Sequence, residues 1–238
     1  MSDDIKIEFL NDSQITQNDS FISFKIIIIG DSGVGKSWIL KRAVQNTFEG
    51  GYRTTIGFEF LLMHFQANEI KIKLQIWDTC GEEKYKSLIQ GFYKNTSLAL
   101  IVYAINEKMS FDSLKNWIQN IKEHSSEDIP IFLVGNKSDL ERTITIEEAE
   151  EFANSNRIEY FEECSAKTGK NVKEIFFEIT KFLYKTYKEA DRKNMLPSSA
   201  DKLKINKNNN NFPVSKKKKC CKWKLFTKNI YYSYNYYL

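Results

Sequence analysis

Apolar residues recur along this chain in two alternating patterns, one typical of strands and one typical of helices. Residues 23–29 are rich in β-branched side chains, end at a glycine and lead into a helical pattern over 36–46. Two more strands are predicted over 58–65 and 70–77, the second with strict alternation of apolar and polar side chains. Only four residues separate these two strands, which predicts an antiparallel hairpin.

Three further pairs of a strand and a helix follow in the second half of the chain. The predicted residues are 98–104 with 111–121, 131–134 with 146–154, and 160–162 with 172–183. The second of these helices has its own start signal, because Thr145 and Glu148 can each satisfy the other's free backbone amide. Strands that alternate with helices are typical of an α/β domain.

The helical pattern stops after residue 190, and the composition changes there. With 238 residues and 42% hydrophobic content, the chain can fill one sizeable core, and its length suits one domain with tails. We therefore expect a polar, acidic N-terminal extension over 1–22, one domain over 23–190 and a disordered tail over 191–238.

The net charge of +4 is unevenly distributed between these segments. The tail holds twelve Lys and Arg residues against two Asp, whereas residues 1–22 hold five acidic residues against one Lys. The segment between them is nearly neutral, which argues against nucleic acid as a partner. A basic tail beside a near-neutral domain favours contact with an acidic membrane surface.

The four cysteines are Cys80, Cys164, Cys220 and Cys221, and they have neither metal-ligand spacing nor an even disulfide framework. The acidic start of the chain has the wrong charge for a signal peptide. No apolar run approaches the roughly 20 residues that span a bilayer. We expect a cytoplasmic protein in a reducing compartment.

A glycine-rich loop lies between the first predicted strand and the first predicted helix. Residues 30–37 read G-D-S-G-V-G-K-S and match the G-x-x-x-x-G-K-S pattern of a phosphate-binding loop. Its glycines let backbone N–H groups point at phosphate, and we expect Lys36 to reach the β and γ oxygens. The nucleotide-binding residues predicted here are Asp31, Ser32, Gly33, Val34, Gly35, Lys36, Ser37 and Trp38. The loop alone predicts a nucleoside triphosphate without identifying the base.

Two further segments predict that the base is guanine. Residues 136–139 read N-K-S-D and follow a buried strand, where ligands of an open α/β sheet bind. The Asp139 carboxylate can accept from both the ring N–H and the exocyclic amine of guanine, a donor pair that adenine lacks. Residues 165–167, S-A-K, follow the next strand. The base-binding residues predicted from these segments are Asn136, Lys137, Asp139, Leu140, Ser165, Ala166 and Lys167.

With these segments in order, residues 23–185 resemble the small GTPases of the Ras superfamily. The fold that this resemblance implies is the α/β P-loop NTPase fold of small G proteins. It has a six-stranded, mostly parallel sheet with one antiparallel edge and helices on both faces, and the nucleotide lies at the carboxyl ends of the strands. The implied ligands are GTP or GDP with Mg²⁺.

The resemblance also implies roles for residues outside the three motifs. The Mg²⁺ ligands would be Ser37, Thr55 and Asp78. By the same resemblance, the Ala166 amide would donate to the guanine carbonyl, and the Gly81 amide would donate to the γ-phosphate. Phe48 matches an aromatic residue that packs on the edge of the guanine, and the alternative is that it is a core residue at a helix end.

Two segments resemble the Rab branch of the superfamily in particular. They are T-I-G-F-E-F at 55–60 and K-L-Q-I-W-D-T at 73–79. The Rab aromatic triad that faces effectors maps onto Phe60, Trp77 and Phe92, although aromatic residues at these positions could equally be core residues. This resemblance implies a role in membrane trafficking, with effectors, exchange factors and activating proteins at the switch regions.

The main departure from the family is Glu82, where relatives have the glutamine that orients the attacking water. The catalytic residues implied by resemblance are Glu82, Gly81 and Lys36, and the glutamate predicts slow intrinsic hydrolysis of GTP. One alternative is a GTP-binding scaffold that does not hydrolyse its nucleotide. Another is an ATP-using kinase or ATPase, which the N-K-S-D segment opposes. His64 and His124 are assigned no role.

The tail carries a further candidate site, since four lysines at 216–219 precede Cys220 and Cys221. This arrangement resembles a Rab tail that receives geranylgeranyl groups and holds the protein reversibly on the cytosolic face of an intracellular membrane. In the family, the cysteines lie within a few residues of the C-terminus, whereas 17 residues follow Cys221 here. Two hypotheses follow: these 17 residues are absent or removed in the functional form, or the cysteines are palmitoylated instead. An unmodified, solvated tail is the remaining alternative.

Overall fold

The computed structural model describes residues 5–50, 58–79, 91, 93–125 and 128–192. The chain divides into two units, Met1–Lys188 and Glu189–Leu238. Every described strand and helix belongs to the first unit, apart from the last residues of the C-terminal helix, which belong to the second.

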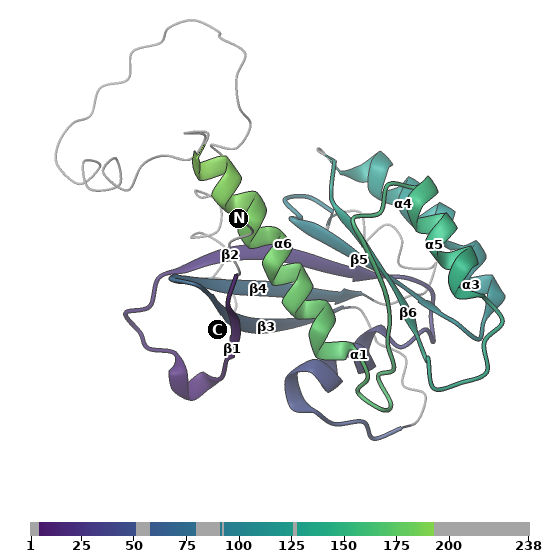
Figure 1. The fold of residues 1–238 in the computed structure, drawn as a ribbon, viewed down its shortest axis with the longest axis horizontal. Coiled ribbons are helices and arrows are strands. Elements are labelled where there is room, and N and C mark those ends of the chain that lie inside the picture. Colours follow the sequence, from purple (N-terminus) through teal and green to yellow (C-terminus); the bar gives the residue numbers. More distant parts are fainter. Residues whose placement is uncertain (1–4, 51–57, 80–90, 92, 126–127, 193–238) are drawn as a thin grey trace, which may run out of the picture. The chain divides into compact units, whose positions relative to one another are not determined.

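Most strands of the described chain are separated by helices, although β3, β4 and β5 follow one another, as do α3 and α4 (Figure 1). The strands are β1 (Ile7–Leu10), β2 (Phe21–Ile29), β3 (Phe58–Ala67), β4 (Ile70–Thr79), β5 (Leu98–Ala104), β6 (Ile131–Asn136) and β7 (Tyr160–Glu163). The helices are the short 3₁₀ helix η1 (Asp12–Gln14), α1 (Lys36–Gln45), α3 (Lys108–Asp112), α4 (Leu114–His124), α5 (Ile146–Ser155) and α6 (Val172–Arg192).

The strands form one sheet in the order β1-β3-β4-β2-β5-β6-β7. All neighbours from β4 to β7 pair in parallel, and the hairpin of β3 and β4 is antiparallel. This confirms the predicted α/β class and mostly parallel sheet. The predicted count of six strands is wrong, because β1 adds a seventh strand, antiparallel to the end of β3.

Most predicted elements agree with the structure to within three residues at each end. The helix predicted over 111–121 is instead two helices that meet at Ser113, where the backbone N–H bonds back to Met109. The helix predicted over 172–183 continues to Arg192. The predicted start signal of α5 is confirmed, since Thr145 and Glu148 exchange side-chain hydrogen bonds of 2.9 and 3.1 Å.

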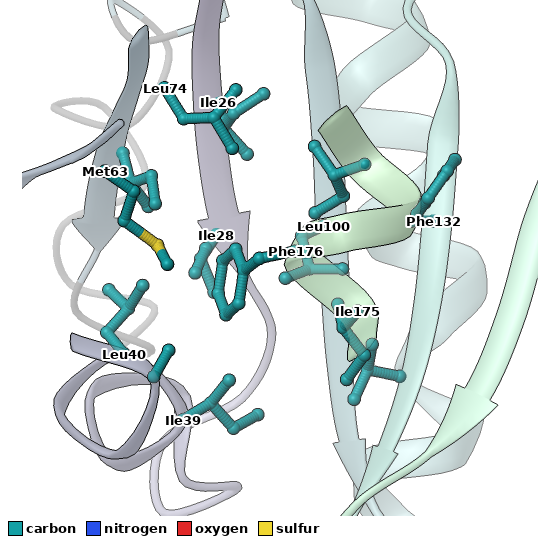
Figure 2. Close-up of a cluster of buried hydrophobic side chains, with 14 of the residues drawn as sticks. Ile26, Ile28, Ile39, Leu40, Met63, Leu74, Leu100, Phe132, Ile175 and Phe176 are labelled. Carbon is teal, nitrogen blue, oxygen red and sulfur yellow. The ribbon is translucent and has the colours of Figure 1, made fainter. Parts of the chain in front are cut away.

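Two apolar layers cover the sheet, one on each face. Alternate residues of β2 divide between them: Ile26 and Ile28 pack with α1 and α6, whereas Ile27 and Ile29 pack with α3, α4 and α5. Figure 2 shows the first layer, in which Phe176 of α6 lies close to Ile28. Because this segment of β2 is buried on both faces, it reads as a continuous apolar run, and the loop after it begins at the carboxyl edge of the sheet.

Candidate functional site

The glycine-rich loop joins the end of β2 to the start of α1, as the sequence predicts. Gly30 and Gly35 have φ values of 139° and 98°, which L side chains rarely adopt. A Cβ at Gly30 would lie 2.1 Å from the Val102 carbonyl oxygen, and one at Gly35 would lie 2.3 Å from Asn136 Nδ2. The loop can therefore follow this path only with glycine at both positions.

Lys36 places its ammonium group at this loop. Its Nζ donates to the carbonyl oxygens of Gly30 and Asp31, at 2.8 and 2.7 Å. The residue is buried and begins α1, so its positive charge adds to the partial positive charge of the helix N-terminus. This arrangement attracts an anionic group such as phosphate.

Two of the predicted Mg²⁺ ligands contact one another. Ser37 Oγ donates to Asp78 Oδ2, which joins the start of α1 to the end of β4. Asp78 is fully buried, and its Oδ1 has no hydrogen-bond partner among the described residues. Burial raises the pKa of the Asp78 carboxyl to about 6, although the Ser37 hydroxyl and Lys36 act in the opposite direction. A buried carboxylate oxygen beside a hydroxyl suits Mg²⁺, which prefers oxygen ligands.

Asn136 connects the phosphate loop with the S-A-K segment. Its Nδ2 donates to the Val34 carbonyl oxygen at 2.8 Å, and its Oδ1 accepts from the Ala166 backbone N–H at 3.1 Å. The phosphate loop follows β2, near the start of the domain's sequence, and the S-A-K segment follows β7, near its end. The two segments meet at the carboxyl end of β6. One amide side chain thus fixes the loop after β2 relative to the loop after β7.

Asp139 lies against the same S-A-K segment. Its Oδ1 accepts from Ser165 Oγ at 2.6 Å, and its Oδ2 lies 3.6 Å from Lys167 Nζ. The side chain is 13% exposed, so the carboxylate is held in place while part of it stays accessible. The N-K-S-D and S-A-K segments therefore form one cluster.

Arg42 of α1 also contacts this cluster, and no sequence motif pointed to it. Its Nε donates to the Ala166 carbonyl oxygen at 2.9 Å, and its Nη2 donates to the Lys167 carbonyl oxygen at 2.6 Å. Because α1 starts at the phosphate loop, this side chain gives the S-A-K segment a second link to that loop.

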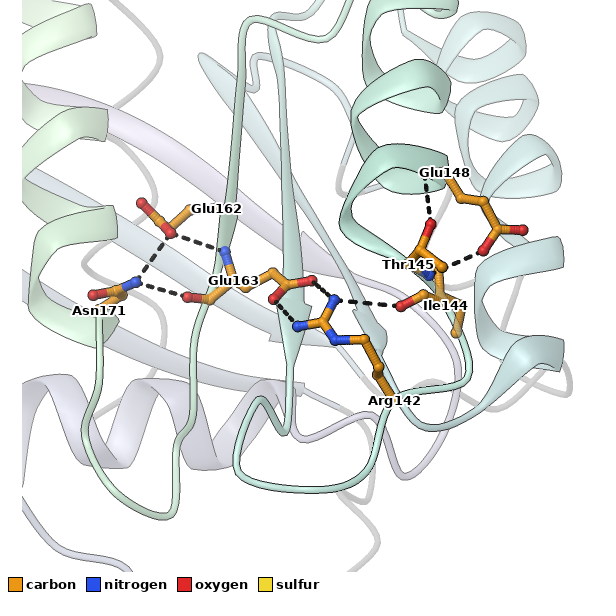
Figure 3. A network of polar contacts seen from close by, with 7 residues as sticks. All are labelled: Arg142, Ile144, Thr145, Glu148, Glu162, Glu163 and Asn171. Atoms are coloured by element: carbon orange, nitrogen blue, oxygen red, sulfur yellow. Dashed lines mark hydrogen bonds and ion pairs between the residues drawn. The ribbon is translucent and has the colours of Figure 1, made fainter.

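Figure 3 shows the polar network that supports the strand before the S-A-K segment. Arg142 donates to both carboxylate oxygens of Glu163, at 3.1 and 2.9 Å, and to the Ile144 carbonyl oxygen. Asn171 donates to Glu162 and to the Glu163 carbonyl oxygen. Two-point contacts of this kind fix orientation, and this one links the segment after N-K-S-D to β7.

The aromatic residues predicted near the site form two pairs. Trp38 and Phe48 lie with their ring centroids 4.8 Å apart and pack against the first apolar layer, so the core alternative for Phe48 stays open. Phe60 and Trp77 are register partners with centroids 5.0 Å apart, and Phe60 is 37% exposed. Leu140 is also exposed, beside Asp139 in the chain.

Several predicted site residues lie outside the described residues. They are Thr55, Gly81, Glu82, Phe92, Cys220 and Cys221. Within the part of the chain that the structure describes, no helix has the length and apolar character to cross a membrane.

The site has a glycine-rich loop at the carboxyl edge of a mostly parallel sheet, a buried lysine at the end of the loop and an aspartate–serine pair beside it. These features define a P-loop nucleotide-binding fold. Residues 25–185 match the model of the Ras family, and the chain therefore belongs to this family of small GTPases.

The similar proteins are of the Rab type. The chain is 35% identical over 206 residues to Ras-related protein RABE1e of Arabidopsis thaliana, covering 84% of this chain and 92% of the relative. It is 37% identical over 191 residues to Ras-related protein Rab-13 of Rattus norvegicus, covering 79% and 94%. It is 35% identical over 198 residues to Ras-related protein SEC4 of Saccharomyces cerevisiae, covering 83% and 90%.

Proposed function

We propose that this protein is a Mg²⁺-dependent switch that alternates between GTP and GDP and binds effectors in its GTP state. The observation that carries the proposal is the Asn136 contact with both Val34 and Ala166, beside an Asp139 carboxylate held by Ser165. A phosphate loop and a carboxylate suited to guanine are thereby fixed relative to one another.

In this proposal, different residues at the carboxyl edge of the sheet bind different parts of the nucleotide. Lys36 and the loop amides bind the phosphates, and Asp139 accepts from the two guanine donors. Ser37 and Asp78 hold Mg²⁺ together with Thr55, and the ion neutralises phosphate charge when bound. A γ-phosphate would then order Thr55 and the segment after Gly81, which partners read as the active state.

Asp139→Asn tests the guanine assignment. The amide that replaces the carboxylate still accepts from the ring N–H but faces the exocyclic amine of guanine with a donor. Affinity for GTP should fall about 100-fold, and affinity for xanthosine triphosphate should rise, because xanthine has a carbonyl where guanine has the amine. Both affinities are measured by competition against a fluorescent guanine nucleotide.

The matched control is Glu141→Gln, which removes an exposed carboxylate two residues away and should leave both affinities unchanged. An Asp139→Asn protein that binds GTP as tightly as the wild type would contradict the assignment.

We further propose that the protein acts in membrane trafficking from the cytosolic face of an intracellular membrane. The Rab-type relatives and the basic tail support this. Four lysines near an anionic leaflet contribute about 1 kcal/mol each, and stable anchoring also needs a lipid, for which Cys220 and Cys221 are the candidates.

Intact mass spectrometry of the protein from its own cells tests the anchor. We expect a mass increase that corresponds to prenyl or palmitoyl groups, mapped by digestion to Cys220 or Cys221. A chain that ends at Leu238 and carries no lipid would contradict both forms of lipid attachment.

One observation favours a second function, namely a GTP-binding scaffold that seldom hydrolyses its nucleotide. Glu82 occupies the position at which the family has a catalytic glutamine. The two functions share the binding site and differ in hydrolysis, so the rate of a single turnover separates them.

A further inference from the structure

A side chain of the phosphate loop is hydrogen-bonded to a helix on the face of the sheet opposite to α1. Trp117 of α4 donates from its indole Nε1 to Asp31 Oδ1 at 2.7 Å, across 86 positions of the sequence. Trp117 belongs to the apolar layer that α3, α4 and α5 form, whereas α1, which continues the loop, belongs to the opposite layer. The contact therefore holds the Asp31 carboxylate toward α4.

Loss of this acceptor would be unfavourable for the indole N–H of Trp117. The residue is 4% exposed, and a buried N–H without an acceptor costs free energy. Its acceptor is a carboxylate, which makes the bond charge-assisted and stronger than a bond between neutral groups. The pair is thus a defined connection between α4 and the loop.

The position of the Asp31 carboxylate matters for a phosphate ligand. Asp31 is the only acidic residue in the segment 30–37, and a carboxylate turned toward the phosphates would repel them. The backbone of the same residue also serves the site, because its carbonyl oxygen accepts from Lys36 Nζ at 2.7 Å. Asp31 is therefore fixed to Trp117 through its side chain and orients Lys36 through its main chain.

We propose that Trp117 is a positioning residue of the phosphate-binding loop. It keeps the Asp31 carboxylate away from the phosphates and steadies the Asp31 carbonyl that orients Lys36. This inference rests on the proposed function, since it concerns the phosphate end of the nucleotide site.

Trp117→Phe tests the proposal, because it keeps an aromatic ring in the core and removes the N–H donor. Release of a fluorescent GDP analogue is followed in the presence of Mg²⁺ and excess unlabelled GDP. We expect Trp117→Phe to accelerate release about tenfold when Asp31 is present. In an Asp31→Ala background, the same change should accelerate release by no more than about twofold, because the carboxylate is already gone.

Ile121→Ala is the matched control for lost packing, since Ile121 is buried on the same helix and in the same apolar layer. It should lower the thermal unfolding midpoint at least as much as Trp117→Phe while leaving GDP release unchanged. The proposal is overturned if Trp117→Phe releases GDP at the wild-type rate. Equal acceleration in both Asp31 backgrounds, or by Ile121→Ala, overturns it as well. A wild-type protein that retains no guanine nucleotide instead overturns the proposed function and this inference with it.

Discussion

In the proposed assignment, Glu82 stands where relatives have a glutamine, so a side chain that only accepts replaces one that can both donate and accept. In the family mechanism, a glutamine holds the attacking water in line with the γ-phosphorus. An ionised glutamate also brings a negative charge toward the phosphate. Two unit charges about 4 Å apart repel by roughly 4 kcal/mol at an effective dielectric constant near 20, before Mg²⁺ and Lys36 neutralise a share of it. Intrinsic hydrolysis should therefore be slow.

Glu82→Gln should accelerate single-turnover hydrolysis of GTP, measured without an activating protein, by about tenfold or more. Glu83→Gln is the matched control, because it removes the neighbouring negative charge without supplying a glutamine at the catalytic position. If Glu82→Gln is no faster than the wild type, the orientation hypothesis is wrong, and the protein is an ordinary cycling switch with a tolerated substitution.

Site residues differ in how far their roles are visible in the sequence. Lys36, Asn136 and Asp139 stand in short motifs whose chemistry depends on neighbours in the chain, and the structure brings these motifs together. Arg42 and Trp117 act on residues 124 and 86 positions away, and on their own helices they look like an ordinary surface arginine and core tryptophan. Their contacts exist only after the sheet has formed.

Among the described strands, β1 is the one that the apolar pattern does not predict. Its four residues stand in a segment with five acidic residues, and so short a run carries little periodicity. The strand is defined by tertiary pairing with the end of β3. Residue 6 adds two hydrogen bonds to Asn68, and Phe9 packs edge-to-face on Phe65 with centroids 5.5 Å apart.

Leu10→Ala should loosen β1 specifically. Leu10 is 7% exposed, and truncating a buried leucine costs at least about 2 kcal/mol, so amide hydrogen exchange in β1 should accelerate about 30-fold. Glu8→Ala is the control on the same strand, because the Glu8 side chain contacts an exposed lysine and contributes little. Identical exchange in the two variants would show that β1 is not held by apolar burial.

Three helices, α3, α4 and α6, show why element boundaries are harder to predict than element types. The apolar spacing over 111–121 is continuous, yet the structure divides this segment at Ser113. Within α3, the Ser110 hydroxyl oxygen accepts from the backbone N–H of Ala104. The end of α6 lies beyond the predicted one because residues 184–192 continue the helix with mostly polar side chains. Local hydrogen bonds decide such ends, and apolar periodicity does not report them.

At the scale of the whole molecule, the selectivity for guanine that we propose depends on loops that follow β2, β6 and β7. Asn136 and Arg42 link the phosphate end to the base end, and Arg142 and Asn171 hold the strand that carries the S-A-K segment. The Asn136 link runs through the buried backbone groups of Val34 and Ala166, so in the proposed complex the Asp139 carboxylate would meet a ligand whose phosphates are already placed. We therefore infer that the base and the phosphates are recognised together.

Competition between ATP and GTP for the purified wild-type protein in Mg²⁺ tests this claim most directly. A fluorescent GDP analogue is displaced by each nucleotide in turn, and the two inhibition constants are compared. We predict that GTP binds more tightly than ATP by a factor on the order of 10⁴, because adenine leaves Asp139 without the two donors that it is placed to accept from. Equal affinity for ATP and GTP would contradict the account.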